Sequence, residues 1–218
     1  MTTEAAPRTR SERTADSRLL ILDAAVACLV EEGYAGASTL AVQARAGVSR
    51  GRLLHHFPSR AELLVAAAGH LSTTLLADVR SRAAAVMADQ PTGRERIDRA
   101  IELMWATFQE PPFWAAMELW TAARTDPELR SALRAEERRL RTAIRAVADE
   151  IWGPAIAAAP HYAELCDLLF TSMRGVAIVY AFEDRPPATD PHVALWQRLA
   201  ATALTAEMAV SARTKETE

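Results

Sequence analysis

The sequence predicts an all-α protein, with an N-terminal three-helix helix-turn-helix domain followed by a larger helical domain, about nine helices in total. Apolar residues recur every three to four positions through most of the chain, and no stretch shows the two-residue alternation of a half-buried strand. Capping residues, glycines and prolines interrupt this pattern where helices would end. Half of the 218 residues are hydrophobic, so the chain is long and apolar enough to bury one or two cores.

The chain is expected to begin with a disordered polar tail over residues 1–16. Its arginines would allow a basic arm, but the acidic residues between them favour a plain tail. Ser17 is the predicted N-cap of the first helix, and Gly33 is predicted to end that helix in a left-handed conformation. We expect the helix-turn-helix domain over residues 17–63 and the second domain over residues 64–218.

Two short helices are predicted between the first helix and the second domain. Ser38 caps the first of them, and Gly47 ends it. Ser49 caps the other, and Pro58 stops it. Two short helices joined by a tight turn form a helix-turn-helix, in which the second helix enters a groove of DNA.

The second of these short helices begins with an unusual charge pattern. Arg50 and Arg52 lie in its first turn, where the partial positive charge of a helix N-terminus disfavours cations. No Asp or Glu occurs between Gly33 and Ala61. DNA phosphates and guanine edges would supply the missing acceptors, so the pattern favours a helix that reads DNA. The plain alternative is a solvated charged face.

Six further helices are predicted after Ser59, which forms a capping box with Glu62. Prolines and glycines separate them, and the Asp-Pro pairs at 126–127 and 190–191 mark two N-termini. The expected helices cover residues 60–88, 94–109, a stretch containing 113–121, 127–152, 161–183 and 190–212.

The last two helices are predicted to form a homodimer. Between Leu165 and Phe182 the only formal charges are Asp167 and Arg174, and a helix that is apolar on nearly all sides must be covered on nearly all sides. In a small domain a second copy of the chain is the natural cover. We therefore expect a four-helix interface between two copies.

Residues 17–70 resemble the N-terminal domain of the TetR/AcrR family of bacterial transcriptional regulators. The resemblance rests on Gly33-Tyr34, Ser38-Thr39, Ala46-Gly47-Val48-Ser49-Arg50-Gly51, and His55-His56-Phe57-Pro58-Ser59-Arg60 followed by Glu62-Leu63-Leu64. A weaker resemblance to the C-terminal domains of the family lies in Glu118-Leu119-Trp120 and Ala122-Ala123-Arg124-Thr125-Asp126-Pro127-Glu128-Leu129. Leu54 stands where a Tyr is common, and Arg52 where a small residue is common, which affects the DNA sequence read rather than the fold.

The resemblance implies a dimeric regulator that binds an inverted-repeat operator in double-stranded DNA. Arg52 is the first candidate for reading a base and His55 the second, while Gly51 lets the backbone approach closely. Ser38, Thr39, His56 and Arg60 are expected to contact phosphates, and two of them lie at helix starts. The full candidate set is Ser38, Thr39, Ser49, Arg50, Gly51, Arg52, Leu54, His55, His56 and Arg60.

The resemblance also implies that the second domain is a ligand-binding and dimerisation domain with a cavity for a hydrophobic or amphipathic small molecule. Aromatic and methionine side chains gather in a short span, and such a stripe is either plain core or pocket lining. The candidates are Met104, Trp105, Phe108, Phe113, Trp114, Met117, Glu118, Trp120, Thr121, Met173 and Arg174. The usual logic of the family is a repressor that the ligand releases; an activator or a co-repressed regulator is the alternative.

Glu118 is an acidic residue in the otherwise apolar stretch from Phe113 to Trp120. A buried carboxylate needs a partner or stays protonated. Arg174 is the candidate partner. Either both residues bond a ligand, or they bond each other and close the core.

The remaining features argue against other classes of protein. The net charge is −3, so DNA contact would be a local patch. The sequence has no nucleophile motif, metal-spaced cluster or phosphate loop, so we expect neither an enzyme nor a cofactor; a structural helical dimer is the other rival. The cysteines, Cys28 and Cys166, are expected to be buried thiols, and a redox sensor is the less favoured alternative. No membrane-spanning run or signal peptide is expected, which predicts a cytoplasmic protein.

Overall fold

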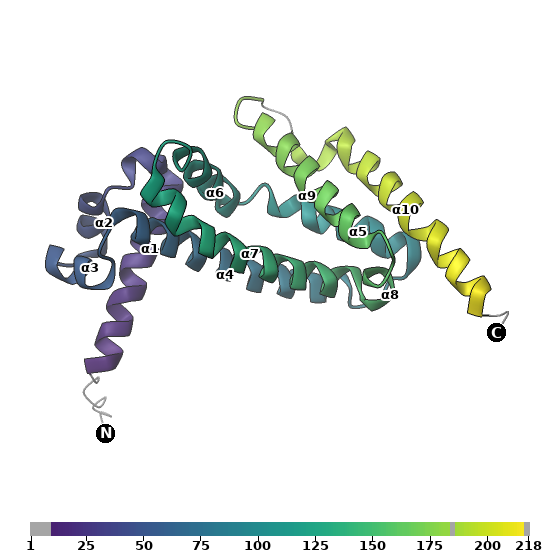
Figure 1. Cartoon of the computed structure of the whole chain (residues 1–218), viewed down its shortest axis with the longest axis horizontal. Helices are drawn as coiled ribbons and strands as arrows, with labels where there is room; N and C mark the ends of the chain where they lie inside the picture. The colour runs from purple at the N-terminus through teal and green to yellow at the C-terminus, as the bar shows by residue number, and fades with distance from the viewer. Residues whose placement is uncertain (1–9, 184–185, 216–218) are drawn as a thin grey trace, which may run out of the picture. The chain divides into compact units, whose positions relative to one another are not determined.

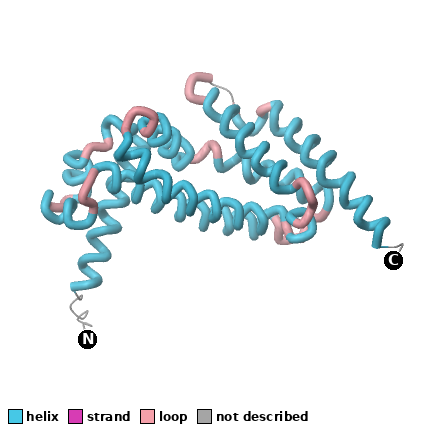
Figure 2. Tube along the Cα trace, in the orientation of Figure 1, coloured by secondary structure: helices cyan, strands magenta, loops and turns pink. Residues whose placement is uncertain are grey.

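The computed structural model describes residues 10–183 and 186–215, with side chains described for 14–183 and 186–204. Within these ranges the chain consists of α-helices, one short 3-10 helix and loops, and no strand is present (Figure 1; Figure 2). The all-α prediction is confirmed. The elements are α1 (Arg10–Gly36), α2 (Thr39–Ala46), α3 (Arg50–His56), α4 (Arg60–Val86), α5 (Gly93–Thr107), α6 (Pro111–Ala122), α7 (Pro127–Trp152), α8 (Pro154–Ala157), α9 (Tyr162–Val179), η1 (Pro187–Thr189) and α10 (Pro191–Lys215).

The start of α1 differs from the expectation. The helix begins at Arg10, so residues 10–16 are helical, and Ser17 is a buried residue inside α1 rather than its N-cap. Arg, Glu and Ala form helices readily, so the polar segment continues the helix that the apolar residues begin. Residues 1–9, the rest of the expected tail, lie outside the described residues.

Gly33 interrupts α1 near its end. Its φ of 69° and ψ of −174° are not helical, and the positive φ suits glycine. Gly33 was expected to end the helix as a left-handed cap. It breaks the helix at the expected residue, but its ψ is far from the left-handed helical value. The chain then continues in a helical turn to Gly36.

The predicted caps of the two short helices are confirmed. The Ser38 hydroxyl accepts a bond of 3.1 Å from the Ala41 N–H, and the Ser49 hydroxyl accepts one of 3.3 Å from the Arg52 N–H. Gly47 ends α2 in the left-handed conformation, with φ 64° and ψ 30°. These local bonds define the turn that directs α3 away from α2.

The long helices also begin where capping residues predict. The Glu62 N–H donates to the Ser59 hydroxyl at 3.2 Å, the Leu129 N–H donates to Asp126 Oδ1 at 3.0 Å, and the His192 N–H donates to Asp190 Oδ1 at 2.8 Å. The ends differ from the expected bounds by a few residues, and α8 was not expected. Helix ends have no strong local signal where no cap or proline defines them.

The contacts divide the chain into two compact units, described separately here. The first comprises the chain up to Thr74 together with Trp114–Leu140, and the second comprises Leu75–Phe113 together with the chain from Arg141. This differs from the boundary expected at residues 63 and 64. The helix-turn-helix shares its core with α6 and the first half of α7.

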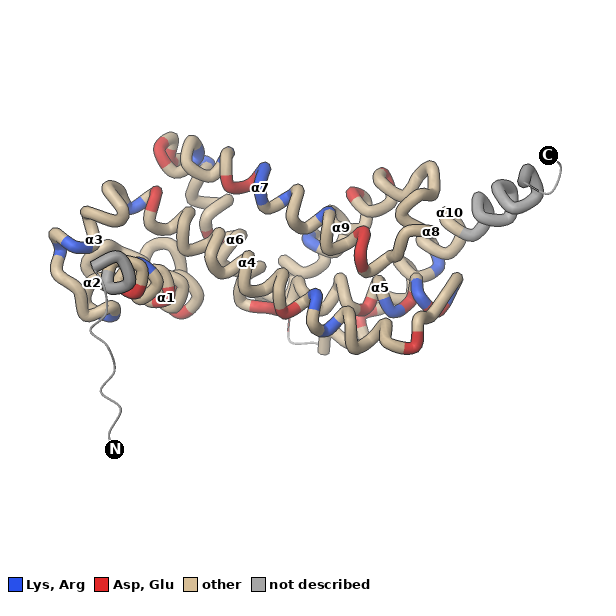
Figure 3. The backbone as a smooth tube through the Cα atoms, turned by 90° about the horizontal axis from the view of Figure 1, so that it is seen from below, with Lys and Arg blue, Asp and Glu red and all other residues tan. Residues whose placement is uncertain are grey.

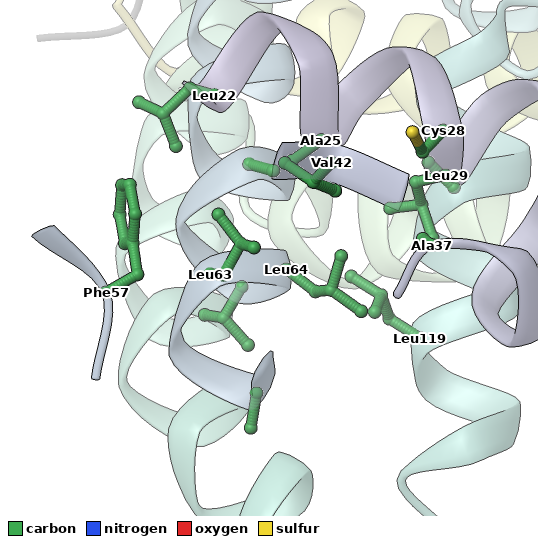
Figure 4. Packing of buried hydrophobic residues seen from close by; sticks show 14 of the residues in the cluster. Leu22, Ala25, Cys28, Leu29, Ala37, Val42, Phe57, Leu63, Leu64 and Leu119 are labelled. Carbon is green, nitrogen blue, oxygen red and sulfur yellow. The ribbon is translucent and has the colours of Figure 1, made fainter. Parts of the chain in front are cut away.

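The core of the first unit explains this division. Leu22, Ala25, Cys28 and Leu29 of α1 pack with Leu63 and Leu64 of α4 and with Leu119 of α6 (Figure 4). Val42, Leu53 and Phe57 anchor α2, α3 and the turn after α3 to the same cluster. Only α1 of the three helices in the helix-turn-helix domain is long, so α4, α6 and α7 complete the core.

The second unit has an aromatic core. The ring centroids of Trp105 and Trp196 are 5.1 Å apart, and those of Phe108 and Phe113 are 5.5 Å apart. The Trp105 indole donates to the Pro187 carbonyl at 2.9 Å, and the Trp196 indole donates to the Ser172 hydroxyl at 2.9 Å. Both indoles are buried with their polar N–H group satisfied, as stable packing requires.

One described helix, α4, is long and apolar enough to span a membrane, with 27 residues and a mean hydropathy of 1.2 over its most apolar stretch. We expected no apolar run of membrane-spanning length, and this expectation is wrong for α4, judged by the length and hydropathy of the helix alone. Its buried residues Leu63, Leu64 and Ala67 belong to the core of the first unit.

Candidate functional site

Helix α3 presents an exposed basic face. Leu53 is buried and anchors the helix, while Arg50, Gly51, Arg52, Leu54 and His55 are exposed. The segment around α3 carries blue arginine and no red acidic residue in Figure 3. Within the described part of the chain no acidic side chain holds either guanidinium of α3, so both can bond an external acceptor.

The capping serines lie at the ends of the same motif. Ser38 and Thr39 are half-buried at the start of α2, and Ser49 is exposed at the start of α3. The Ser38 and Ser49 hydroxyls already accept backbone bonds, but each can still donate its own proton to a phosphate. Their contact with DNA remains a prediction.

His56 is half-buried at the end of α3, and its ring lies 5.4 Å from that of His55 in an edge arrangement. Partial burial lowers the pKa of His56 below its ordinary value, and the charges of His55, Arg18 and Arg52 lower it further. Each of these effects disfavours the protonated imidazole. A nearby phosphate would act in the opposite direction.

Arg60 has an internal role that the sequence did not reveal. Its Nε donates to the Ala37 carbonyl at 3.0 Å, its Nη2 donates to the Tyr34 carbonyl, and its guanidinium lies 4.1 Å from the centroid of the Tyr34 ring. These bonds hold the entry to α2 against the first turn of α4. The phosphate contact of Arg60 stays a prediction, and two of its five N–H donors serve the fold.

Glu118 differs from the expectation of a buried carboxylate. It is exposed, and its Oε2 accepts a bond of 2.9 Å from the Tyr34 N–H within the first unit. The Tyr34 hydroxyl in turn donates to Asp126 Oδ2 at 3.0 Å. In the sequence these bonds are signalled only by the Gly33-Tyr34 pair and by Glu118 in an apolar stretch. The hydrophobic pattern does not indicate that the two sites meet.

The expected ligand-binding residues separate into two groups. Met104, Trp105, Phe108, Phe113 and Met173 are buried in the second unit. Phe170, Tyr180 and Trp196 contact the same aromatic rings and were not among the expected residues. Arg174, half-buried, belongs to this unit as well.

The other expected ligand-binding residues lie on α6 in the first unit: Trp114, Met117, Glu118, Trp120 and Thr121. Thr121 is exposed, and Trp114 and Met117 are half-buried. The Trp120 indole donates to Glu137 Oε1 at 2.6 Å. At Trp120 and Glu118, therefore, the polar groups bond other parts of the chain.

Exposed large apolar side chains occur on α9, in the turn after it and on α10. On α9, Leu168 is 60% exposed and Ile178 is exposed, and Phe182, which follows the end of the helix at Val179, is 77% exposed. Leu195 and Leu199 are exposed on α10. Large apolar side chains grouped on one surface typically mark an interaction site.

Both cysteines are free and buried. Burial raises the pKa of the Cys166 thiol to about 11, so at neutral pH it is a thiol and not a reactive thiolate. This agrees with two structural thiols.

Comparison with known proteins places these features in a family. Residues 21–67, which contain α2, α3 and the adjoining parts of α1 and α4, match the bacterial regulatory proteins of the tetR family. The HTH-type transcriptional regulator CymR of Pseudomonas putida is 32% identical over 176 residues, which cover 78% of this chain and 82% of CymR.

Solved structures show the same fold. A putative TetR-family transcriptional regulator from Mesorhizobium loti superposes with a TM-score of 0.62 at 17% identity, over 93% of this chain and 98% of that one. The multidrug binding protein EbrR, solved in complex with imidazole, superposes with a TM-score of 0.57 at 21% identity, over 86% of this chain and 94% of that one. With the exposed arginines of α3, the family match over residues 21–67 and the extended similarity to CymR, the chain belongs to the TetR family of bacterial transcriptional regulators.

Proposed function

We propose that this TetR-family regulator is a repressor that binds an inverted-repeat operator as a dimer and is released by a hydrophobic or amphipathic small molecule. The observation that carries the DNA-binding part is α3, whose exposed Arg50 and Arg52 lie at the helix start within an acid-free segment. Each arginine can donate two bonds to a guanine in the major groove.

Leu54 adds an apolar element to the same face. It is 40% exposed and lies one turn after Arg50. An apolar side chain on a reading helix suits the methyl group of a thymine. Replacing the thymines of the bound DNA by uracil should weaken binding of the unaltered protein and leave a Leu54→Ala variant unaffected; equal losses would remove Leu54 from the readout.

The proposed dimer forms through α9 and α10, because both helices expose large apolar residues that a second copy of the chain would cover. A single short reading helix has limited specificity. Two copies would present two α3 helices to half-sites about one DNA turn apart or more, which implies an inverted repeat.

The proposed effector site is the aromatic cluster of the second unit. Phe108, Phe113, Met104 and Met173 supply an apolar lining, and Arg174 supplies a polar group in the same unit. The name of the structural neighbour EbrR, a multidrug binding protein, supports a ligand at such a domain. The alternatives are a plain aromatic core, and a ligand that promotes DNA binding or activation.

We further propose a cytoplasmic, non-catalytic protein without a membrane anchor or cofactor. Its relatives are transcriptional regulators, which act on the chromosome. The rival proposal is a helical ligand-binding or scaffolding dimer with weak DNA affinity, and it leaves the arginines of α3 without a role.

The test is a selection of genomic DNA fragments by the purified full-length protein at near-physiological salt. Recovery of one short inverted repeat would establish a dimeric, operator-specific regulator, and the adjoining genes would indicate the effector class. Recovery of diffuse, salt-sensitive fragments alone would contradict operator-specific repression and favour the scaffolding rival or a ligand-dependent regulator.

A further inference from the structure

Tyr34 connects the helix-turn-helix to three other elements of the first unit. Its N–H donates to Glu118 of α6 at 2.9 Å, and its hydroxyl donates to Asp126, the cap of α7, at 3.0 Å. Its carbonyl accepts from Arg60 of α4, whose guanidinium also lies over the Tyr34 ring. We name these four residues, Tyr34, Arg60, Glu118 and Asp126, the Tyr34 clamp.

Gly33 makes the clamp possible. Its φ of 69° breaks α1 just before Tyr34, and a Cβ at this position would lie 3.1 Å from Glu118 Oε2. Any other residue would be strained by the backbone and pressed against the carboxylate. The break and the close approach of Glu118 therefore depend on the same glycine.

The clamp acts on the entry to α2. Arg60 donates to the Ala37 carbonyl at 3.0 Å, and Ala37 directly precedes Ser38, the N-cap of α2. The Ala37 N–H donates to the Gly33 carbonyl at 3.1 Å. The segment from Gly33 to Ser38 is thus held from both sides, and the direction in which α2 and α3 leave it depends on these bonds.

Helix α6 belongs to both units of the chain. Before it, Glu110 accepts a bond of 3.0 Å from Arg82, and Phe113 packs against Phe108 in the second unit. Glu118 lies five residues after Phe113 and belongs to the first unit, so its bond to Tyr34 stays within that unit.

We propose that Glu118 is a positioning residue of the DNA-reading domain, which holds the entry to α2 through the Tyr34 clamp. It is therefore not a ligand-binding residue. The proposal rests on the proposed DNA-binding function for its effect on affinity, but the clamp itself can be tested without DNA.

The first test measures the affinity of the full-length protein for a DNA fragment that it selects from the genome. Glu118→Ala is compared with Glu118→Gln, which keeps an acceptor oxygen, and with Glu32→Ala, which removes an equal charge from exposed Glu32 of α1. Loss of an acid alone should tighten binding to DNA in both alanine variants. The clamp instead predicts binding about tenfold weaker for Glu118→Ala, within the range of couplings between sites, and binding within about twofold of the unaltered protein for Glu118→Gln. If Glu118→Ala bound the DNA fragment more tightly than the unaltered protein, by as much as Glu32→Ala does, the proposal would be overturned.

The second test follows amide hydrogen exchange in the same full-length variants without DNA. Glu118→Ala should exchange faster from Tyr34 through α2, while Leu63 and Leu64 of α4 keep their protection and Glu118→Gln resembles the unaltered protein. If the α4 amides also lose protection, Glu118→Ala has destabilised the whole unit and cannot test the clamp. The Tyr34→Phe variant is then used, because it removes only the bond to Asp126. Tyr34→Phe should then accelerate exchange at the entry to α2 alone.

Unchanged exchange at Tyr34 in Glu118→Ala, or in Tyr34→Phe where that variant decides, would refute the clamp. If the unaltered protein selects no specific fragment, the proposed function fails, and the exchange result alone decides on the clamp. The two failures are therefore distinguishable.

Discussion

At the scale of single residues, Arg52 offers the most direct test of DNA reading. It is exposed on α3, with its main-chain N–H bonded to the Ser49 cap. Arg52→Ala should cost about 1–3 kcal/mol in binding to the selected fragment and relax the preference at one base pair. The control is Arg134→Ala, which removes the same charge from an exposed position of α7. Equal losses in the two variants, with an unchanged base preference, would show that Arg52 does not read a base.

His56 provides a test that depends on pH. Because its pKa in the folded protein lies below the ordinary value, the unfolded chain binds more protons between the two values. Its contribution to the free energy of unfolding therefore rises with pH through that window and is lost as the pH falls below about 6.5. In NMR titrations the His56 ring should show a midpoint below 6.5 in the free protein.

Addition of the selected DNA fragment should raise the His56 midpoint, since a phosphate stabilises the imidazolium. The exposed ring of His161 at the start of α9 serves as the reference. A His56 midpoint that stays in place while DNA binds would exclude the predicted phosphate contact.

At the scale of elements, α10 depends on a buried cap. Asp190 is 4% exposed, accepts from the His192 N–H at 2.8 Å and accepts from the Tyr180 hydroxyl at 2.6 Å. Asp190→Ala removes the cap and the acceptor that the half-buried Tyr180 hydroxyl uses, so the free energy of unfolding should fall by about 2–4 kcal/mol. Asp190→Asn keeps an acceptor and should lose less than half as much.

Urea unfolding at fixed protein concentration measures both variants. Ser131→Ala, an exposed change on α7, is the control. Equal loss in Asp190→Ala and Ser131→Ala would mean that the cap does not stabilise α10.

At the scale of the whole molecule, the exposed apolar residues of α9 and α10 predict the oligomeric state. Glutamate at Leu168 or Leu199 would place a charge in the proposed interface, where desolvation is costly. Sedimentation at micromolar concentration should show a dimer for the unaltered protein and a monomer for Leu168→Glu. Leu20→Glu on α1, where the leucine is comparably exposed, should remain a dimer. A monomeric unaltered protein would refute the interface and with it the inverted-repeat operator.

The sequence alone was sufficient for the helical class and for most helix starts. Ser38, Ser49, Asp126 and Asp190 each bond a main-chain N–H two or three residues further on. Such bonds are local, and so residue type and spacing predict them directly. The family resemblance over residues 17–70 was likewise readable, because its motif is contiguous in the chain, and the match over 21–67 confirms it.

Tertiary structure decided which distant residues meet. Glu118 bonds Tyr34 across 84 positions of sequence, and Arg60 bonds Ala37 across 23. An apolar pattern indicates that a helix side is covered but not by which element, so the sequence could not show that α6 takes part in both units or that Glu118 is exposed. Local capping energies are set within one turn, whereas these long-range pairings depend on how the whole set of helices packs.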